Sequence, residues 1–263
     1  KSSMVKGGLK LKREIVSSTP INPIGDLVVA EIWVDASVYH LDSEFSYLIP
    51  GDLSSLVTIG SFVVVPFHGR EITGVVVALS ELEGKTGLKS ISKVIGTIPL
   101  LSEKTISLIR SACQRYACHP FDIIRSAVPD RVAGVERAFR HPLISQNLSA
   151  DAATRSYLQL PPVSPRSVLL SQKILQLLKS GPVLVVLPDA REIRLLADEL
   201  ERAGIEFVEI GSHLPKSENF LNFLKARAGT TKLVIGTRSA IFTPLFNLST
   251  IIIYNEGSDP FTV

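Results

Sequence analysis

Two polar segments near the C-terminal end of the sequence stand where chemistry on a nucleotide would be expected. Gly236-Thr237-Arg238-Ser239 follows the apolar run 233–235, and Tyr254-Asn255-Glu256-Gly257 follows the apolar run 251–253. Apolar runs of this kind are typical of buried parallel strands, and ligands of open α/β sheets bind beyond the carboxyl ends of such strands. Backbone N–H groups, hydroxyls and the Arg238 guanidinium suit phosphate. The second segment has only Glu256 where a nucleotide-hydrolysing enzyme needs an acidic pair for magnesium.

The elements that would position these segments alternate between helices and buried strands from about residue 166 onward. This alternation predicts a doubly wound α/β domain with a parallel sheet. A short helix and a turn around Thr243-Pro244 are expected between the last two strands. The longer helices are expected at 168–180, 190–204 and 217–229, and the strands at 183–188, 207–211, 232–236 and 249–254.

The first part of the chain has strands without intervening helices. Apolar segments separated by turn residues predict a small β-barrel or sandwich. The segment 74–80, with three valines behind Gly74, is expected to be a central strand. The other strands are expected at 27–35, 45–50, 61–67 and 88–96.

Between the two sheets the apolar residues change to helical spacing. Ser102 is expected to be the N-cap of a helix that places Ile106, Ile109, Cys113 and Tyr116 on one face. Further short helices are expected over 120–128 and 130–139.

These patterns predict a multidomain protein of the α+β and α/β classes. The expected parts are a basic flexible tail (1–27), a β-rich domain (28–98), a small helical domain (99–145), a linker (146–165) and an α/β lobe that is incomplete at its C-terminal end (166–263).

Composition excludes several classes of protein. A hydrophobic content of 45% and a mean hydropathy of +0.28 indicate packed cores rather than disorder. The sequence has no apolar run of about 18 residues, so no membrane span is predicted, and the basic N-terminal segment lacks the apolar core of a signal peptide. A net charge of +3 permits a nucleic-acid partner without arguing for one.

The cysteines and histidines show no metal-binding pattern. A zinc site needs about four ligands, whereas Cys113 and Cys118 have only His119 beside them. We expect two reduced thiols on a buried helix, which fits a reducing cytoplasm. His68, His119 and His141 each adjoin a turn or a proline and are expected in loops.

Several motifs, in this order over residues 28–263, carry a resemblance to a known family. They are HLDSEFSYLIPGDL, VVVPFHGR, SACQRYACHP and KLVIGTRSAIFTPLFNLSTIII. The chain resembles the bacterial primosomal replication-restart protein PriA (primosomal protein N′), in its actinobacterial branch. The resemblance implies a domain that binds the 3′ end of a DNA strand, a winged-helix-like domain and a RecA-like first helicase lobe.

The lobe departs from the family at its nucleotide site. The place of the phosphate loop G-x-x-x-x-G-K-[ST] reads Ser164-Pro165-Arg166, with no glycine, and Lys173 falls inside the helix. The family's DEEH box is replaced by residues 254–257, which leaves Asn255 and Glu256 as remnants of a nucleotide and metal site. We therefore expect a degenerate lobe with no catalytic residue, no ATP or magnesium and no zinc. In the family the zinc-binding cysteines lie beyond the point where this chain ends.

The resemblance also implies candidate DNA-binding residues. Lys89 matches a lysine of the family's 3′-end pocket, whereas Ser46 stands where the family has an aspartate. A serine can hydrogen-bond but lacks the charge-assisted bond to a 3′-OH. Arg70 after the 68–69 turn is a candidate phosphate contact, and Arg238 and Ser239 correspond to a turn that faces single-stranded DNA in the family. Tyr47 is expected in the core.

The function that these features predict is DNA binding during replication restart, without ATPase or helicase activity. The implied partners are forked or branched DNA with single-stranded segments, other primosome proteins and the replicative helicase or its loader. The expected location is the cytoplasm, at the nucleoid. Two alternatives stay open: an active ATP-dependent 3′-to-5′ helicase with an unconventional phosphate site, and a protein–protein scaffold with vestigial DNA surfaces. Basic residues clustered on one face of residues 28–98 would favour DNA binding over the scaffold.

Overall fold

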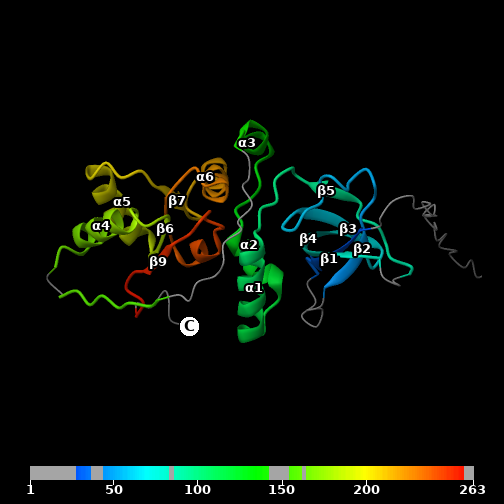
Figure 1. The fold of residues 1–263 in the computed structure, drawn as a ribbon, viewed down its shortest axis with the longest axis horizontal. Helices are drawn as coiled ribbons and strands as arrows, with labels where there is room; N and C mark the ends of the chain where they lie inside the picture. The colour runs from blue at the N-terminus through cyan, green and yellow to red at the C-terminus, as the bar shows by residue number, and fades with distance from the viewer. Residues whose placement is uncertain (1–27, 37–43, 83–85, 142–153, 162–163, 258–263) are drawn as a thin grey trace, which may run out of the picture.

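The chain folds into two sheet-containing parts with a group of helices between them. The computed structural model describes residues 28–36, 44–82, 86–141, 154–161 and 164–257 (Figure 1). Within these residues it has mixed α and β structure with two sheets, which confirms the mixed α and β content expected from the sequence. The predicted tail (1–27) and residues 146–153 and 162–163 of the predicted linker (146–165) lie outside the described residues.

The N-terminal sheet is antiparallel and closes into a small barrel. Its strands are β1 (Val28–Val34), β2 (Phe45–Leu48), β3 (Phe62–Phe67), β4 (Arg70–Glu81) and β5 (Lys93–Ile95). Their order is β2-β1-β4-β3-β5, so the segment predicted to be central is confirmed as central. The two edges are joined because the Leu48 N–H donates to the Lys89 carbonyl (2.9 Å) and the Leu48 carbonyl accepts from the Ile91 N–H (3.0 Å). We call this sheet the barrel.

Successive side chains along each strand point to opposite sides of the sheet, and both sides of the barrel sheet are buried by apolar residues. One face lines the interior with Ala30, Ile32 and Val34 of β1 and includes Tyr47, which is 4% exposed, so its predicted place in the core is confirmed. The Tyr47 hydroxyl donates to the Pro66 carbonyl at 3.3 Å. The outer face carries a second apolar cluster, formed by Trp33, Val75 and Val77 with residues of the helices.

The helical part consists of α1 (Glu103–Tyr116), α2 (Pro120–Ala127) and α3 (Ala133–Ala138). Ser102 is the N-cap of α1, as predicted, and its hydroxyl accepts from the Thr105 N–H at 3.1 Å. The apolar sides of α1 and α2 cover the outer face of the barrel through Ile106, Ile109, Phe121 and Ile124. The helices α1 and α2 therefore share a core with the barrel.

Three details of this helical part differ from the sequence expectations. Tyr116 is 72% exposed, because it lies in the last turn of α1, beyond the part that packs on the barrel. Cys118 lies after the end of α1 and both cysteines are half-buried, so they do not sit together on a buried helix. His119 is the buried N-cap of α2, and its Nδ1 accepts from the Phe121 N–H at 3.2 Å.

The C-terminal part is a parallel sheet with helices on both faces. Its strand order is β7-β8-β6-β9, and every pair in it is parallel. Its elements are α4 (Arg166–Leu177), β6 (Val183–Val186), α5 (Ala190–Arg202), β7 (Val208–Ile210), α6 (Lys216–Ala228), β8 (Leu233–Gly236), the 3₁₀ helix η1 (Arg238–Phe242) and β9 (Thr250–Ile253). We call residues 164–257 the lobe.

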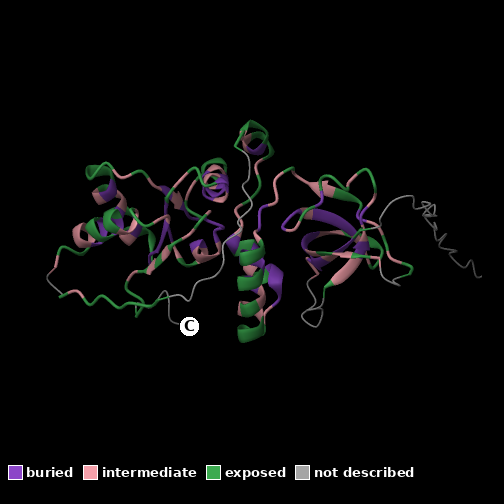
Figure 2. Cartoon of the chain, viewed as in Figure 1, coloured by how far each residue is buried: buried purple, intermediate pink, exposed green. Residues whose placement is uncertain are grey.

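Apolar runs in the lobe strands supply both faces of the sheet. Val183 and Val185 of β6 pack on α4 and α5, whereas Leu184 and Val186 pack on α6. The strands β6 and β8 are fully buried, and Figure 2 shows buried residues concentrated in the interiors of the two sheets.

The strand β9 differs from the buried strand that its isoleucines predict. It is the edge strand of the described sheet, and Ile251 and Ile253 are 46% and 50% exposed. Only Ile252 packs toward the α4 and α5 side of the lobe. An apolar run alone cannot distinguish a central strand from an edge strand, because that difference depends on which neighbours cover it.

Candidate DNA-binding site

Ser46 lies against a carboxylate on the outer surface of the barrel. It stands opposite Glu31 in the register of β1 and β2, and its hydroxyl donates to Glu31 Oε2 at 2.8 Å. The Ser80 hydroxyl of β4 donates to the other oxygen of Glu31 at 3.3 Å. The sequence reasoning missed Glu31, although a single acidic residue inside the apolar strand Val28–Val34 was a signal that could have found it.

Lys89 lies at the same edge of the barrel as Ser46. Its carbonyl accepts from the N–H of Leu48, two residues beyond Ser46 on β2, and its side chain is exposed. Ser46 and Lys89 come from motifs that lie far apart in the sequence, yet they lie on neighbouring segments of the folded chain. The sequence spacing alone could not show this.

Arg70 lies at a different place, the tip of the β3–β4 hairpin. The hairpin turns through His68 and Gly69, whose φ values of 45° and 78° are those of the two-residue turns that fit twisted strands. Arg70 pairs with Phe67 across the hairpin and is exposed. The Phe67 ring meets Phe45 of β2 edge-on at 5.1 Å, so the tip lies near the start of β2.

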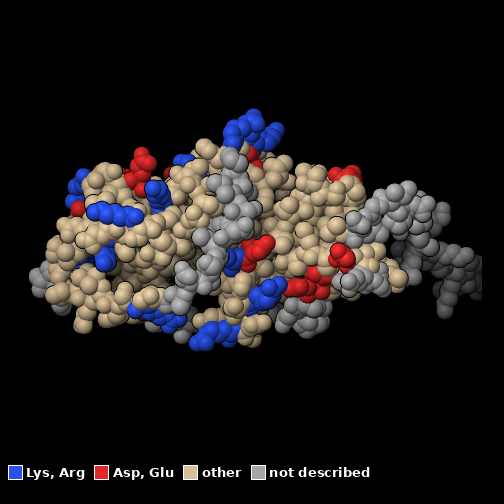
Figure 3. All heavy atoms as spheres, in the orientation of Figure 1, with Lys and Arg blue, Asp and Glu red and all other residues tan. Residues whose placement is uncertain are grey.

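The barrel surface is more acidic than basic. Figure 3 shows Lys and Arg gathered over α3 and the lobe helices on this face of the molecule, and acidic side chains over the barrel. A cluster of basic residues on one face of residues 28–98 was expected to favour DNA binding, and the barrel face shown in Figure 3 has no such cluster. The described basic residues of the barrel are Arg70, Lys89 and Lys93, and the described acidic ones are Glu31, Asp35, Glu44, Asp52, Glu71 and Glu81.

Arg238 and Ser239 begin the 3₁₀ helix η1 directly after β8. Gly236 is required before them, because a Cβ there would lie 2.5 Å from the Ile210 carbonyl oxygen and 2.6 Å from the Ala240 Cβ. Phe242, at the end of η1, packs against the apolar cluster of α1 and α2. The turn therefore also joins the lobe to the helical part, while the Arg238 side chain is exposed.

Asn255 and Glu256 follow β9 and are exposed at the same edge of the sheet as Arg238. The Leu187 N–H donates to the Gly236 carbonyl (2.8 Å) and the Tyr254 N–H to the Val186 carbonyl (2.9 Å), so the two turns flank the end of β6. This arrangement is the strand-end edge that the sequence predicts. Asn255 has a φ of 55°, in the left-handed region.

The described residues at this edge lack two features that are typical of an ATP and magnesium site. The N-cap of helix α4 is Pro165, whose side chain makes no cap hydrogen bond, and no glycine stands among residues 154–166 to let backbone N–H groups surround a phosphate. Glu256 is the single acidic residue of the 254–257 turn. The described parts of the chain contain no group of three or more His, Cys, Asp or Glu that could hold a metal ion.

Across the same described ranges, no helix has both the length and the apolar character that a membrane crossing requires.

Comparisons with known proteins point to one family. Residues 31–129, which include most of the barrel together with α1 and α2, match the family model of the PriA 3′ DNA-binding domain (3′BD). A probable replication restart protein PriA of Mycobacterium tuberculosis (strain CDC 1551 / Oshkosh) is 30% identical over 254 residues, which covers 85% of this chain and 38% of the relative. The corresponding values are 29%, 85% and 39% for the protein of the same name from Mycobacterium leprae (strain TN). They are 24%, 86% and 37% for a replication restart protein PriA of Rickettsia felis. The chain thus spans about two fifths of the length of these curated relatives.

Proposed function

We propose that this chain, which belongs to the PriA family of replication restart proteins, binds DNA at the ends and branches of abandoned replication forks and promotes reloading of the replicative helicase. One observation carries the proposal. Within the segment that matches a 3′ DNA-binding domain, the Ser46 hydroxyl of β2 bonds to the Glu31 carboxylate of β1, and the backbone of the exposed Lys89 bonds to Leu48 of β2.

The chemistry of this edge suits the terminus of a DNA strand. A terminal 3′-OH can donate a hydrogen bond to a carboxylate, and such charge-assisted bonds are about twice as strong as neutral ones. Glu31 supplies the carboxylate across the strand pair, although position 46 itself holds a serine. Lys89 adds a positive charge for the last phosphate. Because the surrounding barrel is acidic, we infer that it contacts an end rather than a long run of phosphates.

Further contacts are assigned to Arg70 at the hairpin tip and to Arg238 and Ser239 at the lobe edge. We propose that the lobe acts without hydrolysing ATP. Removing one preorganised electrostatic donor costs roughly 3–4 kcal/mol in a transition state, and here both the phosphate loop and the acidic pair are missing from the sequence. The lobe then serves as a platform for other primosome proteins, including the replicative helicase or its loader.

The end-binding part is tested by fluorescence anisotropy with oligonucleotides that carry either a 3′-OH or a 3′-phosphate. We expect preference for the 3′-OH, lost by about tenfold in Glu31→Gln, since hydrogen bonds to charged groups contribute about 1.5–3 kcal/mol. Lys89→Ala should weaken binding to both oligonucleotides. The matched controls are Glu71→Gln and Lys93→Ala, which change exposed barrel residues away from Ser46. An unchanged 3′-OH preference in Glu31→Gln would refute this assignment.

The remaining parts have separate tests. Binding of a fluorescent ATP analogue with magnesium should be undetectable, and DNA-stimulated ATP hydrolysis should be absent. Measurable hydrolysis would instead support the active helicase. Affinity for forked DNA no greater than for a bland acidic polymer, together with DNA-independent binding of a primosome protein, would support the scaffold.

A further inference from the structure

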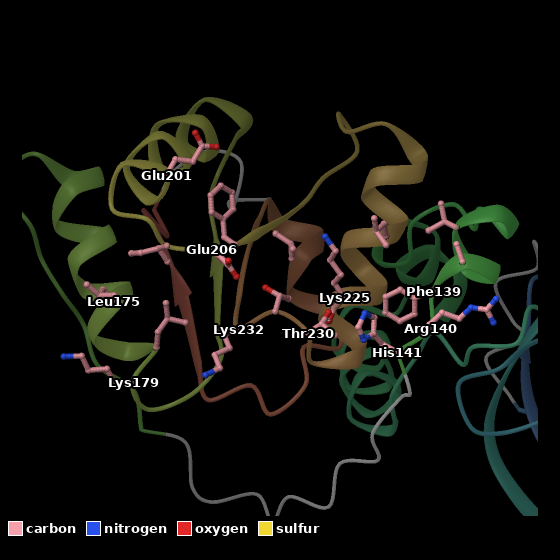
Figure 4. A pocket seen from close by; sticks show the side chains of 18 residues that line it. Phe139, Arg140, His141, Leu175, Lys179, Glu201, Glu206, Lys225, Thr230 and Lys232 are labelled. Atoms are coloured by element: carbon pink, nitrogen blue, oxygen red, sulfur yellow. The ribbon is translucent and has the colours of Figure 1, made fainter.

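A large groove lies at the opposite edge of the lobe sheet from the Gly236 and Tyr254 turns. It has a volume of about 1270 Å³ and is bounded by α3, α4, α6 and the segment between α5 and β7 (Figure 4). Phe207 and Lys232, which stand directly before β7 and β8, place it at the amino ends of the strands. It is therefore separate from every site assigned above.

Positive charge dominates the lining of this groove. Arg140, Lys179, Lys225 and Lys232 line it, together with His141, against the two carboxylates Glu201 and Glu206. Within the described residues none of these four cations forms an ion pair. In Figure 4, Arg140 and Glu201 lie at opposite ends of the groove, with Glu206 between them, so Glu201 does not neutralise the α3 end.

The walls between these cations are apolar and partly aromatic. Phe139 and His141 lie with ring centroids 5.2 Å apart, and Phe207 contributes a third ring. The other apolar side chains in the walls are Val135, Ala138, Leu175, Leu178, Ile205, Val208 and Leu221. Rings set among positive charges are the combination that binds single-stranded nucleic acid, because bases stack on the rings while phosphates meet the cations.

We propose that this groove binds a short segment of single-stranded DNA, independently of the strand end. An acidic peptide would satisfy the charges but would bring no bases to stack on the exposed parts of the rings. Double-stranded DNA is a poorer fit, since stacking on side-chain rings requires bases that are splayed out of a helix. The proposal adds a second DNA contact, on the lobe and α3, to the end contact proposed for the barrel.

The groove is tested with internal single strands whose 3′ end is blocked by phosphate, so that the 3′-OH contact of the barrel makes no contribution. In the double variant Lys225→Glu/Lys232→Glu we expect affinity to fall by tenfold or more at low salt. The slope of log K against log salt should become shallower by roughly 0.7 for each phosphate that the variant no longer binds. The matched control is Lys173→Glu/Arg194→Glu, which reverses two exposed charges on α4 and α5 outside the groove and should leave both values unchanged.

Stacking has its own readout. Fluorescence of 2-aminopurine within the blocked strand should be quenched on binding to the wild type, and less so in Phe139→Leu, which keeps an apolar side chain. Photocrosslinks from 5-iodouracil should map to residues 139–141 or 205–207. The proposal is overturned if the charge-reversal and control variants bind alike, or if crosslinks fall only elsewhere. Competition by polyglutamate as effective as that by oligonucleotide would assign the groove to an acidic protein instead.

These outcomes are distinguishable from failure of the proposed function. An unchanged 3′-OH preference in Glu31→Gln refutes the end contact, and weaker binding of blocked strands by the groove variant then leaves the groove assignment intact. If the 3′-OH preference is lost in Glu31→Gln as expected but the groove variants bind blocked strands as the wild type does, only the groove assignment is refuted.

Discussion

Removing the Glu136 carboxylate should destabilise the junction between the barrel and α3. Glu136 is buried, and its Oε1 accepts from the Thr97 N–H (2.6 Å), the Ile98 N–H (3.1 Å) and the Thr97 hydroxyl (3.2 Å). Its Oε2 pairs with Arg131. In Glu136→Ala the two backbone donors lose their acceptor at about 1–3 kcal/mol each. Arg131, whose side chain is 31% exposed, can turn to water at little cost. We therefore expect a loss of about 2–6 kcal/mol in the free energy of unfolding.

Urea unfolding followed by fluorescence of Trp33 measures this loss. Trp33 is the single tryptophan of the chain and is buried between the barrel and α1. Glu136→Gln, which keeps one carbonyl oxygen, should lose less than Glu136→Ala. The control Glu218→Ala changes an exposed residue of α6 and should stay within about 0.5 kcal/mol of wild type. If Glu136→Ala matched this control, the hydrogen bonds at Thr97 and Ile98 would not support the junction as argued.

Three further outcomes are expected. Burial raises the pKa of Tyr47 above its ordinary value of 10.0, so the folded state holds this proton more tightly and the free energy of unfolding should fall as pH rises above 10. Urea titrations at several pH values should show a smaller fall with pH in Tyr47→Phe, and an equal fall would contradict the assignment. The Cys113 and Cys118 thiols are 3.8 Å apart, so the thiol oxidant diamide should form an intramolecular disulfide in the native protein, detected as a loss of two mass units; diamide adducts without that product would argue against it. Gly236→Ala should destabilise the lobe by about 1–3 kcal/mol, as overpacking does, whereas Gly257→Ala, at a position with open space, should be close to neutral in thermal unfolding.

The period of the apolar residues was sufficient to predict the elements of the lobe. Runs such as 183–186 and 233–235 supply both faces of the sheet, and the helices between them follow the predicted alternation. Ser102 was also predictable as an N-cap, because a hydroxyl before an apolar periodic segment satisfies local N–H groups. These are properties of neighbouring residues, which a sequence displays directly.

The features that escaped prediction depend on contacts between distant segments. The exposure of Ile251 and Ile253 follows from the position of β9 at the sheet edge. The pairing of Ser46 with Glu31 follows from strand register, and the groove follows from the placement of α3 beside α6. Lys89 and Ser46 were identified by resemblance, but their common edge depends on the bonds that close the barrel at Leu48. The predicted domain boundaries stay a prediction, since α1 and α2 share a core with the barrel across residue 98.

The two proposed DNA contacts differ in physical character, and this difference explains why one chain would carry both. As proposed, the barrel would read a strand end through hydrogen bonds on an acidic surface. That surface would repel phosphates and so supply selectivity with little affinity. The groove carries four cations and three rings but nothing that could distinguish an end, so it would supply affinity with little selectivity. Binding at the groove would raise the effective concentration of a nearby strand end at the barrel, which compensates for the weakness of the end contact. Salt should then weaken overall binding much more than it weakens the preference for a 3′-OH, because counterion release acts on the phosphate contacts.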